Sequence, residues 1–209
     1  MSVPRVCLVD TGMGNLRSVE RALTRAGALV SSTREPSEVR GAERLVVPGQ
    51  GGFGECARAL ADGLGEVIRE HIASGRPYLG ICLGMQILFE SSEEAPGAAG
   101  LGLFRGDVQR LTPGVDPDDP ERRLKVPHMG WNQVRGEHPL LPDGEWFYFV
   151  HSYRCVPADE GLAVGASDYG QSVCAAVARD NVFACQFHPE KSQRAGALLL
   201  ERFVEDRWS

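Results

Sequence analysis

The feature that most constrains the fold of this sequence is a cysteine flanked by glycines, at the point where an apolar run meets a helical pattern. Residues 78–81 predict a buried strand, and residues 83–90 place apolar side chains at helical spacing. Cys82 lies at the junction, with Gly80 before it and Gly84 after it. Because backbones crowd at such a sharp turn, the neighbouring residues need to lack side chains. The pattern predicts a nucleophile elbow with cysteine in the place of serine.

An elbow of this kind would activate the cysteine. The N-terminus of the following helix favours a thiolate, and the backbone N–H of Leu83 can stabilise an oxyanion. A buried cysteine in an apolar strand is more often inert packing. We interpret four others in that way: Cys7, Cys155, Cys174 and Cys185. The paired glycines favour the nucleophile interpretation for Cys82.

The composition excludes several classes of function. The chain has 209 residues, 43% of them hydrophobic and 24% charged, so we expect one globular domain spanning residues 1–209. Its formal net charge is −6 and it has no basic block, which argues against a nucleic-acid partner. No apolar run is long enough to span a membrane, and the N-terminus lacks a signal-peptide core. Six scattered cysteines without a C-x-x-C pair argue against zinc and disulfides, so we expect no metal, no cofactor and a cytoplasmic location.

The first half of the chain alternates apolar strands with helices. The predicted strands are 6–10, 29–32, 45–47 and 78–81, and the predicted helices are 16–26, 53–74 and 83–90. This alternation predicts a parallel sheet covered on both faces. Active sites in such sheets lie at the carboxyl ends of the strands, where Cys82 falls.

From residue 103 strands follow one another without helices, at 104–111, 131–134, 146–150, 162–166, 173–178 and 182–187. They predict an antiparallel extension of the sheet. The polar, proline-rich segment 113–123 predicts an exposed loop. A final helix is expected at 193–207, with Ser192 as its cap. The predicted fold is α/β: a mainly parallel open sheet flanked by helices, with an antiparallel extension.

A cysteine nucleophile needs a base and an acceptor that orients it. His188 ends an apolar strand, and Glu190 lies two positions later, on the same side of an extended chain. We therefore predict a Cys82–His188–Glu190 triad. His71 and His138 are expected to be solvated, and residues alone leave the roles of His128 and His151 open.

A second oxyanion donor could come from the glycine-rich segment Gly49-Gln50-Gly51-Gly52, where the backbone can approach a substrate closely. A plain tight turn or a phosphate cradle remains an alternative, although the segment lacks the Lys-Ser/Thr of a P-loop. These residues predict a cysteine hydrolase or acyl-transfer enzyme that works through a thioester. They do not identify the substrate.

Three motifs resemble class I, triad-type glutamine amidotransferases: P-G-Q-G-G-F at 48–53, G-I-C-L-G-M-Q at 80–86 and F-H-P-E at 187–190. Further motifs resemble the glutaminase subunits of imidazole glycerol phosphate synthase: D-T-G-M-G-N-L-R-S-V at 10–19, P-H-M-G-W-N at 127–132, F-V-H-S-Y-R at 149–154 and F-H-P-E-K-S-Q at 187–193. The resemblance covers essentially the whole chain. Two positions depart from the family pattern, Thr11 where tyrosine is frequent and Gln50 where valine is frequent.

The resemblance implies that Cys82 attacks the side-chain amide of glutamine while His188, oriented by Glu190, transfers the proton to ammonia. It assigns the oxyanion hole to Leu83, Gln50 and Gly51, and the glutamine pocket to Gly49, Gln86, Ser152 and Tyr153. It also implies a heterodimer with a (βα)8-barrel cyclase subunit, through which ammonia reaches a ribotide intermediate in histidine biosynthesis. The positions expected at that interface are Asn15, Trp131, Asn132 and Lys191.

Two alternatives remain at this point. The same chemistry could supply a different synthase, which the P-H-M-G-W-N segment argues against. The chain could also be an inactive interaction module on a glutaminase scaffold, which the intact Cys82, His188 and Glu190 argue against.

Overall fold

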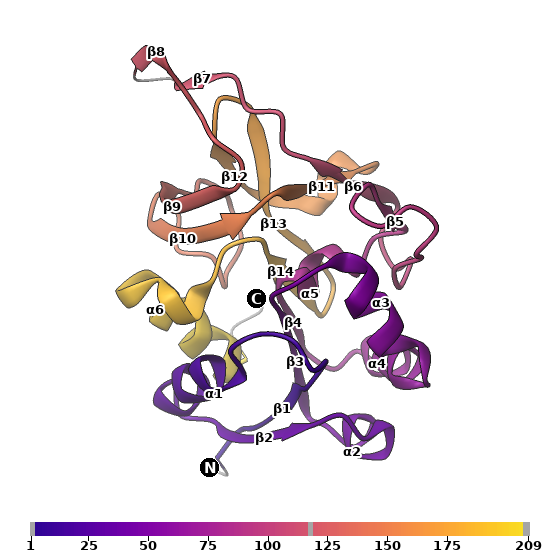
Figure 1. The fold of residues 1–209 in the computed structure, drawn as a ribbon. Helices are drawn as coiled ribbons and strands as arrows, with labels where there is room; N and C mark the ends of the chain where they lie inside the picture. Colours follow the sequence, from indigo (N-terminus) through magenta and orange to yellow (C-terminus); the bar gives the residue numbers. More distant parts are fainter. Residues whose placement is uncertain (1–2, 117–118, 207–209) are drawn as a thin grey trace.

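A seven-stranded sheet forms the centre of the protein in a computed structural model that describes residues 3–116 and 119–206 (Figure 1). The strand order is β12-β13-β14-β4-β3-β1-β2. The strands are β1 (Arg5–Val9), β2 (Leu29–Thr33), β3 (Arg44–Gly49), β4 (Tyr78–Cys82), β12 (Ala163–Asp168), β13 (Ser172–Arg179) and β14 (Val182–Cys185). The first four and β14 run parallel, whereas β13 and β12 continue the sheet antiparallel. The predicted fold class is confirmed.

Helices cover both faces of the sheet because its strands alternate their buried side chains. The helices are α1 (Leu16–Arg25), α2 (Pro36–Arg40), α3 (Phe53–Ala61), α4 (Leu64–Ala73), α5 (Leu83–Gln86) and α6 (Gln193–Val204). Cys7, Val9 and Val47 pack on one face with α2 to α5, while Leu8 and Ile81 pack on the other with α1 and α6. Both faces of the parallel strands are therefore buried, as their unbroken apolar runs predict.

Two predicted helices differ from the structure. The helix expected at 53–74 is α3 and α4, which are separated where Gly63 takes a left-handed φ of 87°. The helix expected at 83–90 ends after α5, a single turn. Backbone N–H groups of residues 100–104 bind the carbonyls of residues 87–90, which would otherwise accept from a continuing helix. A tertiary contact thus overrides the local helical pattern. The sequence pattern also missed α2, although Pro36 suits a first helical position.

The second half adds smaller sheets to one edge of this core. A ribbon pairs β9 (His128–Gln133) with β10 (Trp146–His151), and a second sheet joins β5 (Ser91–Ser92), β6 (Gly106–Arg110) and β11 (Tyr153–Pro157). The strands β5 and β11 were not predicted. Two short 3-10 helices, η1 (Glu160–Leu162) and η2 (Pro189–Lys191), complete this part.

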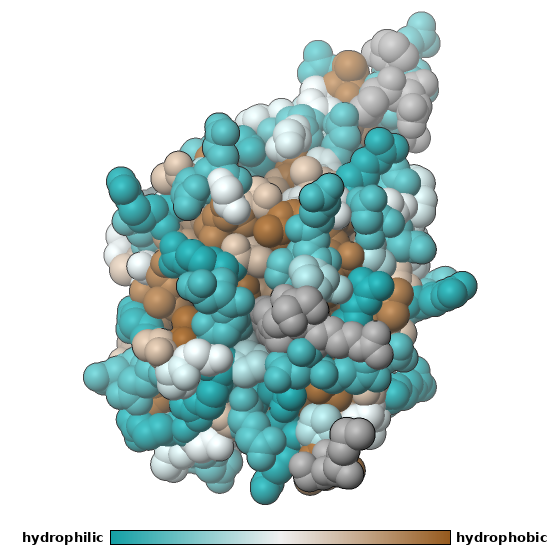
Figure 2. Space-filling model, turned by 180° about the vertical axis from the view of Figure 1, so that it is seen from behind, coloured by the Kyte–Doolittle hydropathy of each residue, from teal (hydrophilic) through white to brown (hydrophobic). Residues whose placement is uncertain are grey.

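The segment expected to be a loop at 113–123 contains a hairpin of β7 (Val115–Asp116) and β8 (Asp119–Arg123), with 117–118 outside the described residues. The hairpin stands away from the body in Figures 1 and 2. Most of the surface seen in Figure 2 is hydrophilic, with hydrophobic residues gathered in the upper part of the body. Across residues 3–116 and 119–206, no helix has the length and apolar character needed to cross a membrane.

Several side-chain predictions also need correction. His71 is fully buried, not solvated, and its Nε2 lies 3.0 Å from the carbonyl oxygen of Pro77. Burial lowers the pKa of His71 to about 4. His138 is half-buried, and burial lowers its pKa as well. The last helix ends at Val204, and Arg207 of the predicted helix lies outside the described residues.

Candidate active site

Cys82 occupies a strained turn at the carboxyl end of β4. Its φ of 54° and ψ of −104° are unusual for a residue with a side chain. A Cβ at Gly80 would lie 2.4 Å from the carbonyl oxygen of Gly84, and a Cβ at Gly84 would lie 1.8 Å from the carbonyl oxygen of Val47. Only glycine fits at either position. The predicted elbow is therefore present, and its two glycines are required by close backbone contacts.

We expect Gly84→Ala to destabilise the protein strongly, because the added methyl group would force β3 and α5 apart. Overpacking of this severity should lower the free energy of unfolding by about 3 kcal/mol or more. Urea denaturation measures the change. Gly41→Ala is the matched control, since a Cβ there would lie 3.6 Å from its nearest neighbour. Equal stability of the two variants would contradict the close contact at position 84.

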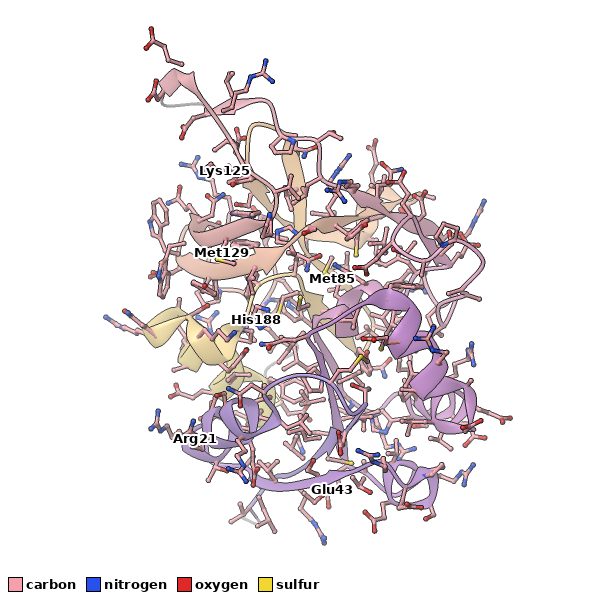
Figure 3. The ribbon with its side chains drawn as sticks, viewed as in Figure 1. Arg21, Glu43, Met85, Lys125, Met129 and His188 are labelled. Carbon is pink, nitrogen blue, oxygen red and sulfur yellow. The ribbon has the colours of Figure 1, made fainter. Side chains whose placement is uncertain are left out.

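His188 and Glu190 meet beside the elbow, just beyond the end of β14. His188 Nδ1 lies 2.8 Å from Glu190 Oε1, and each side chain is only 2% exposed. Figure 3 shows His188 in the middle of the molecule, between the β9–β10 ribbon, which carries Met129, and α5, which carries Met85. Because β14 lies beside β4 in the sheet, the strand order brings the predicted base to the predicted nucleophile.

The backbone of His188 is fastened to the ribbon. Its N–H donates to the carbonyl oxygen of Tyr148 at 2.9 Å, and its own carbonyl accepts from the Ser192 hydroxyl at 2.6 Å. That hydroxyl accepts from the N–H of Tyr148 at 3.0 Å. Ser192 is the N-cap residue of α6, as predicted, but its hydroxyl makes no cap hydrogen bond. Its hydroxyl holds His188 against β10.

Charge, rather than solvent, controls the protonation of His188. Burial by itself would lower the pKa of this imidazole, but its interactions with the side chains of Cys82 and Glu190 raise it to about 10. Nδ1 of His188 is bonded to Glu190, so its interaction with the Cys82 side chain involves Nε2, which makes no hydrogen bond of standard geometry within the described residues. A buried imidazolium next to a nucleophile is placed to protonate a leaving amine. No group of three or more His, Cys, Asp or Glu within the described ranges is arranged to hold a metal.

The glycine-rich segment lies directly opposite the elbow. Gly49, the last residue of β3, is the register partner of Cys82, and a Cβ on Gly49 would lie 2.6 Å from Leu83 Cβ. Gly51 has a φ of 131°, which favours glycine. Leu83 opens α5, so no earlier helical carbonyl accepts its N–H. The structure thus places Gly49 against Leu83, and the predicted oxyanion residues Gln50 and Gly51 follow Gly49 directly in the chain.

The residues predicted to bind glutamine differ in their surroundings. Gln86 is 5% exposed, and its Nε2 donates to the carbonyl oxygen of Tyr153 at 3.2 Å and to Oε1 of Gln186 at 3.0 Å. Ser152 and Tyr153 are partly buried. Sequence reasoning missed Gln186, whose Nε2 donates to Cys82 Sγ at 3.4 Å. The signal was present, because a glutamine inside an apolar run is expected to be buried and hydrogen-bonded.

The two histidines left undecided by the sequence form a buried pair. His128 Nδ1 lies 3.0 Å from His151 Nε2, and His151 Nδ1 lies 2.8 Å from the carbonyl oxygen of Tyr153. Burial lowers the pKa of His128 to about 3 and that of His151 to about 4, each with a smaller contribution from a neighbouring histidine. Both rings are therefore neutral at pH 7.

The four residues predicted at an interface occupy several settings. Asn15 caps α1, since its Oδ1 accepts from the N–H of Ser18 at 3.3 Å. Trp131 is 44% exposed and packs edge-on against Tyr148. Lys191 Nζ lies 5.8 Å from the Tyr148 ring centre, and Asn132 donates to the carbonyl oxygen of Asp168 at 2.7 Å. Three of the four therefore lie on or beside the ribbon that holds His188.

At the unusual position 11, Thr11 is buried, and its hydroxyl has no partner within the described residues. The second departure, Gln50, is half-buried, and Gly14 of the neighbouring loop packs against its backbone N–H. A Cβ on Gly14 would lie 3.2 Å from Gln50 N. The segment that contains Gln50 is therefore covered by the loop after β1, which ends at the helix cap Asn15.

A parallel α/β sheet, a cysteine elbow and a buried His–Glu pair together are the features of a cysteine hydrolase or acyl-transfer enzyme. The family model that matches the chain is glutamine amidotransferase class-I, over residues 7–206. The imidazole glycerol phosphate synthase subunit HisH of Syntrophotalea carbinolica is 48% identical over 95% of this chain and 98% of its own length. The HisH subunit of Aromatoleum aromaticum is 49% identical over 95% and 97%. The chain belongs to the class I glutamine amidotransferases, within the family of these HisH subunits.

Solved structures show the same fold at lower sequence similarity. A structure described as a glutamine amidotransferase has a TM-score of 0.75 at 20% identity and covers 96% of this chain and 97% of its own. PurLQS from Thermotoga maritima has a TM-score of 0.74 at 21% identity and covers 98% and 99%. These solved structures therefore have the same fold as the one predicted from the sequence.

Proposed function

We propose that this protein hydrolyses glutamine to glutamate and ammonia, and that it supplies the ammonia to a synthase partner in histidine biosynthesis. The observation that supports this function most directly is the site itself: Cys82 on a strained elbow, beside a His188–Glu190 pair whose side chains are each only 2% exposed. Membership in the family of imidazole glycerol phosphate synthase HisH subunits supports the pathway.

In the proposed mechanism, the Cys82 thiolate attacks the side-chain amide carbon of glutamine. The carbon–nitrogen bond breaks, and His188 gives its proton to the departing ammonia, leaving a glutamyl thioester on Cys82. Water then attacks the thioester while His188 removes a proton, and glutamate leaves as the thiolate re-forms. Glu190 holds the His188 ring in the orientation that directs Nε2 toward the reacting atoms.

The negative oxygen formed during each attack needs donors. We assign the backbone N–H of Leu83 and that of Gln50 or Gly51 to this oxyanion hole, because the register of β3 on β4 places the two segments side by side. The glutamine pocket is proposed to include Gly49, Ser152 and Tyr153. Gln86 borders it, with its amide nitrogen already committed to Tyr153 and Gln186.

The partner is proposed to be a (βα)8-barrel cyclase subunit that binds the outer face of the β9–β10 ribbon. Residues at alternate positions share that face, and three large side chains on it are well exposed: Met129 at 61%, Trp131 at 44% and Trp146 at 54%. Exposed hydrophobic groups gathered in this way are typical of protein interfaces. Asn15 and Lys191 are proposed to complete the contact, and Asn132, on the opposite face of β9 from Trp131, is proposed to contribute from the cleft beside the ribbon.

Two further parts of the proposal follow from this arrangement. Ammonia must reach the partner without meeting water, where it would be protonated, so docking beside His188 favours direct transfer. All six cysteines are free, as is typical of proteins in a reducing cytoplasm, where we place this subunit.

The decisive experiment measures glutamate release by this chain alone and then with its cognate cyclase subunit and that subunit's ligand. We expect the rate to rise by ~10²–10³-fold in the complex, the range associated with completing an oxyanion hole. High activity alone, unchanged by the cyclase, would keep the glutaminase chemistry but overturn the partner. No activity in either state would favour an interaction module without catalysis.

A further inference from the structure

A continuous series of buried and partly buried hydrogen bonds runs from the β9–β10 ribbon to the sulfur of Cys82. We call it the polar chain, and its members in order are Asn132, His128, His151, the carbonyl of Tyr153, Gln86, Gln186 and Cys82. Its members come from β9, β10, β11, α5, the residue after β14 and the end of β4. The polar chain therefore connects elements that are far apart in sequence.

In the outer half of the polar chain, from Asn132 to the Tyr153 carbonyl, all hydrogen bonds are donated in the same direction, inward. Because His151 Nδ1 faces the Tyr153 carbonyl, it must carry the proton, which leaves His151 Nε2 as an acceptor. His128 therefore donates from Nδ1 at 3.0 Å, and its Nε2 accepts from the Asn132 amide at 3.4 Å. The second N–H of that amide donates to the carbonyl oxygen of Asp168. Each ring is thus fixed in one tautomer.

In the inner half of the polar chain, from the Tyr153 carbonyl to Cys82, nearly every donor and acceptor already has a partner. The Tyr153 carbonyl accepts from His151 and from Gln86, which occupies both lone pairs. Gln86 Nε2 gives its second N–H to Gln186 Oε1 at 3.0 Å, and Gln186 Nε2 donates to Cys82 Sγ at 3.4 Å. Gln186 is fully buried. A change at one link cannot be absorbed locally, because the neighbouring groups have few other partners.

The two ends of the polar chain face different environments. Asn132 and His128 line a cleft of about 1400 Å³ between the β7–β8 hairpin and the ribbon, where Lys125 and Met129 also lie (Figure 3). The His128 ring is held flat there, stacked on Tyr169 at a centroid distance of 3.9 Å and on Phe149 at 4.6 Å. The inner end is Cys82. The outer end is therefore open to a docked partner, and the inner end is the reacting atom.

We propose that the polar chain positions Cys82, with Gln186 as the residue that orients its sulfur and the His128–His151 pair as residues that act through Gln186. The role rests on the proposed function, since it makes Asn132, in the cleft beside the ribbon, part of the control of the nucleophile. A donor at the sulfur stabilises the thiolate and fixes its direction. A partner that contacts Asn132 can then influence Cys82 through these hydrogen bonds, without any movement of the main chain.

The test measures the rate at which iodoacetamide alkylates Cys82 in the isolated chain, followed by peptide mapping. This reaction needs neither glutamine nor a partner. Gln186→Met keeps the volume of the side chain and removes its hydrogen bonds, and His128→Phe keeps the stacking between Tyr169 and Phe149. We expect the alkylation rate of each variant to be lower than that of the unaltered protein by about threefold or more. A threefold change corresponds to about the lower end of the coupling energies between residues of one hydrogen-bond network. The double variant should be no slower than Gln186→Met alone.

Tyr169→Phe is the matched control, because it keeps the stacking on His128 and loses only a hydrogen bond to the carbonyl oxygen of Lys125, outside the polar chain. It should react at the unaltered rate. If His128→Phe does not fold, Asn132→Ala at the partly buried outer end takes its place in the cycle. Thermal unfolding checks that the compared variants are folded.

Two results would overturn the proposal. An unchanged rate in Gln186→Met would show that the hydrogen bond does not position the sulfur. Effects that multiply in the double variant would show that the two sites act independently. Failure of glutamine hydrolysis with the expected alkylation rates would instead remove the proposed function and leave the coupling in place.

Discussion

Cys82→Ala will reduce glutamate release in the complex with the cyclase to the background rate, a loss of at least ~10⁴-fold, because no other group can form the thioester. The remaining site can still bind glutamine, so the defect should appear in kcat rather than KM. The measurement is glutamate release at saturating glutamine, together with mass spectrometry for a glutamyl adduct, which only the unaltered protein should form.

Cys174→Ala is the control for this prediction. Cys174 lies on β13, partly exposed, and burial raises the pKa of its thiol to about 12, so it remains a thiol at neutral pH. We expect Cys174→Ala to retain full activity. Turnover by Cys82→Ala near the unaltered rate would rule out a cysteine nucleophile at this elbow.

Glu190→Gln will cost roughly 10²–10⁴-fold in kcat, the range for losing an acceptor that fixes the tautomer of a catalytic histidine. Oε1 of Glu190 accepts from His188 Nδ1 at 2.8 Å, and its charge helps to keep the pKa of His188 at about 10. A glutamine amide that presents its nitrogen to His188 Nδ1 would neither accept this hydrogen bond nor carry the negative charge. The pH–rate profile should show the step for His188 moved to lower pH, since losing the negative charge lowers the pKa of the imidazole.

Glu70→Gln provides the comparison, because Glu70 pairs with Arg40 on the surface, where both side chains are about half exposed. Such pairs contribute little, and we expect unchanged kinetics and stability. If Glu190→Gln kept the unaltered kcat and pH profile, the buried His188–Glu190 pair would have a structural role only.

The active-site prediction succeeded where the chemistry is local in sequence. Gly80, Cys82 and Gly84 reveal the elbow because the spacing of small residues around a reactive one is a local steric requirement. His188 and Glu190 are likewise two positions apart, and their contact needs only an extended segment. The alternation of apolar runs with helices similarly predicts the parallel sheet.

Predictions failed where a distant segment decides the outcome. Nothing in the sequence near residues 87–90 shows that the backbone N–H groups of residues 100–104 will bind their carbonyls and end α5 after one turn. His71 looks like a surface residue until Pro77 is placed against it. Ser192 has the position of a helix cap, but His188 and Tyr148 occupy its hydroxyl.

The sequence by itself therefore determined the class of sheet, the elbow and the residues able to carry the chemistry, because periodicity, small residues and short spacings act within a few positions. The tertiary structure alone decided which polar groups meet: Gln186 at the Cys82 sulfur, His128 at His151 and Gly49 beside Leu83. The physical reason is that buried polar groups must find partners, and those partners come from whichever strands the topology places side by side.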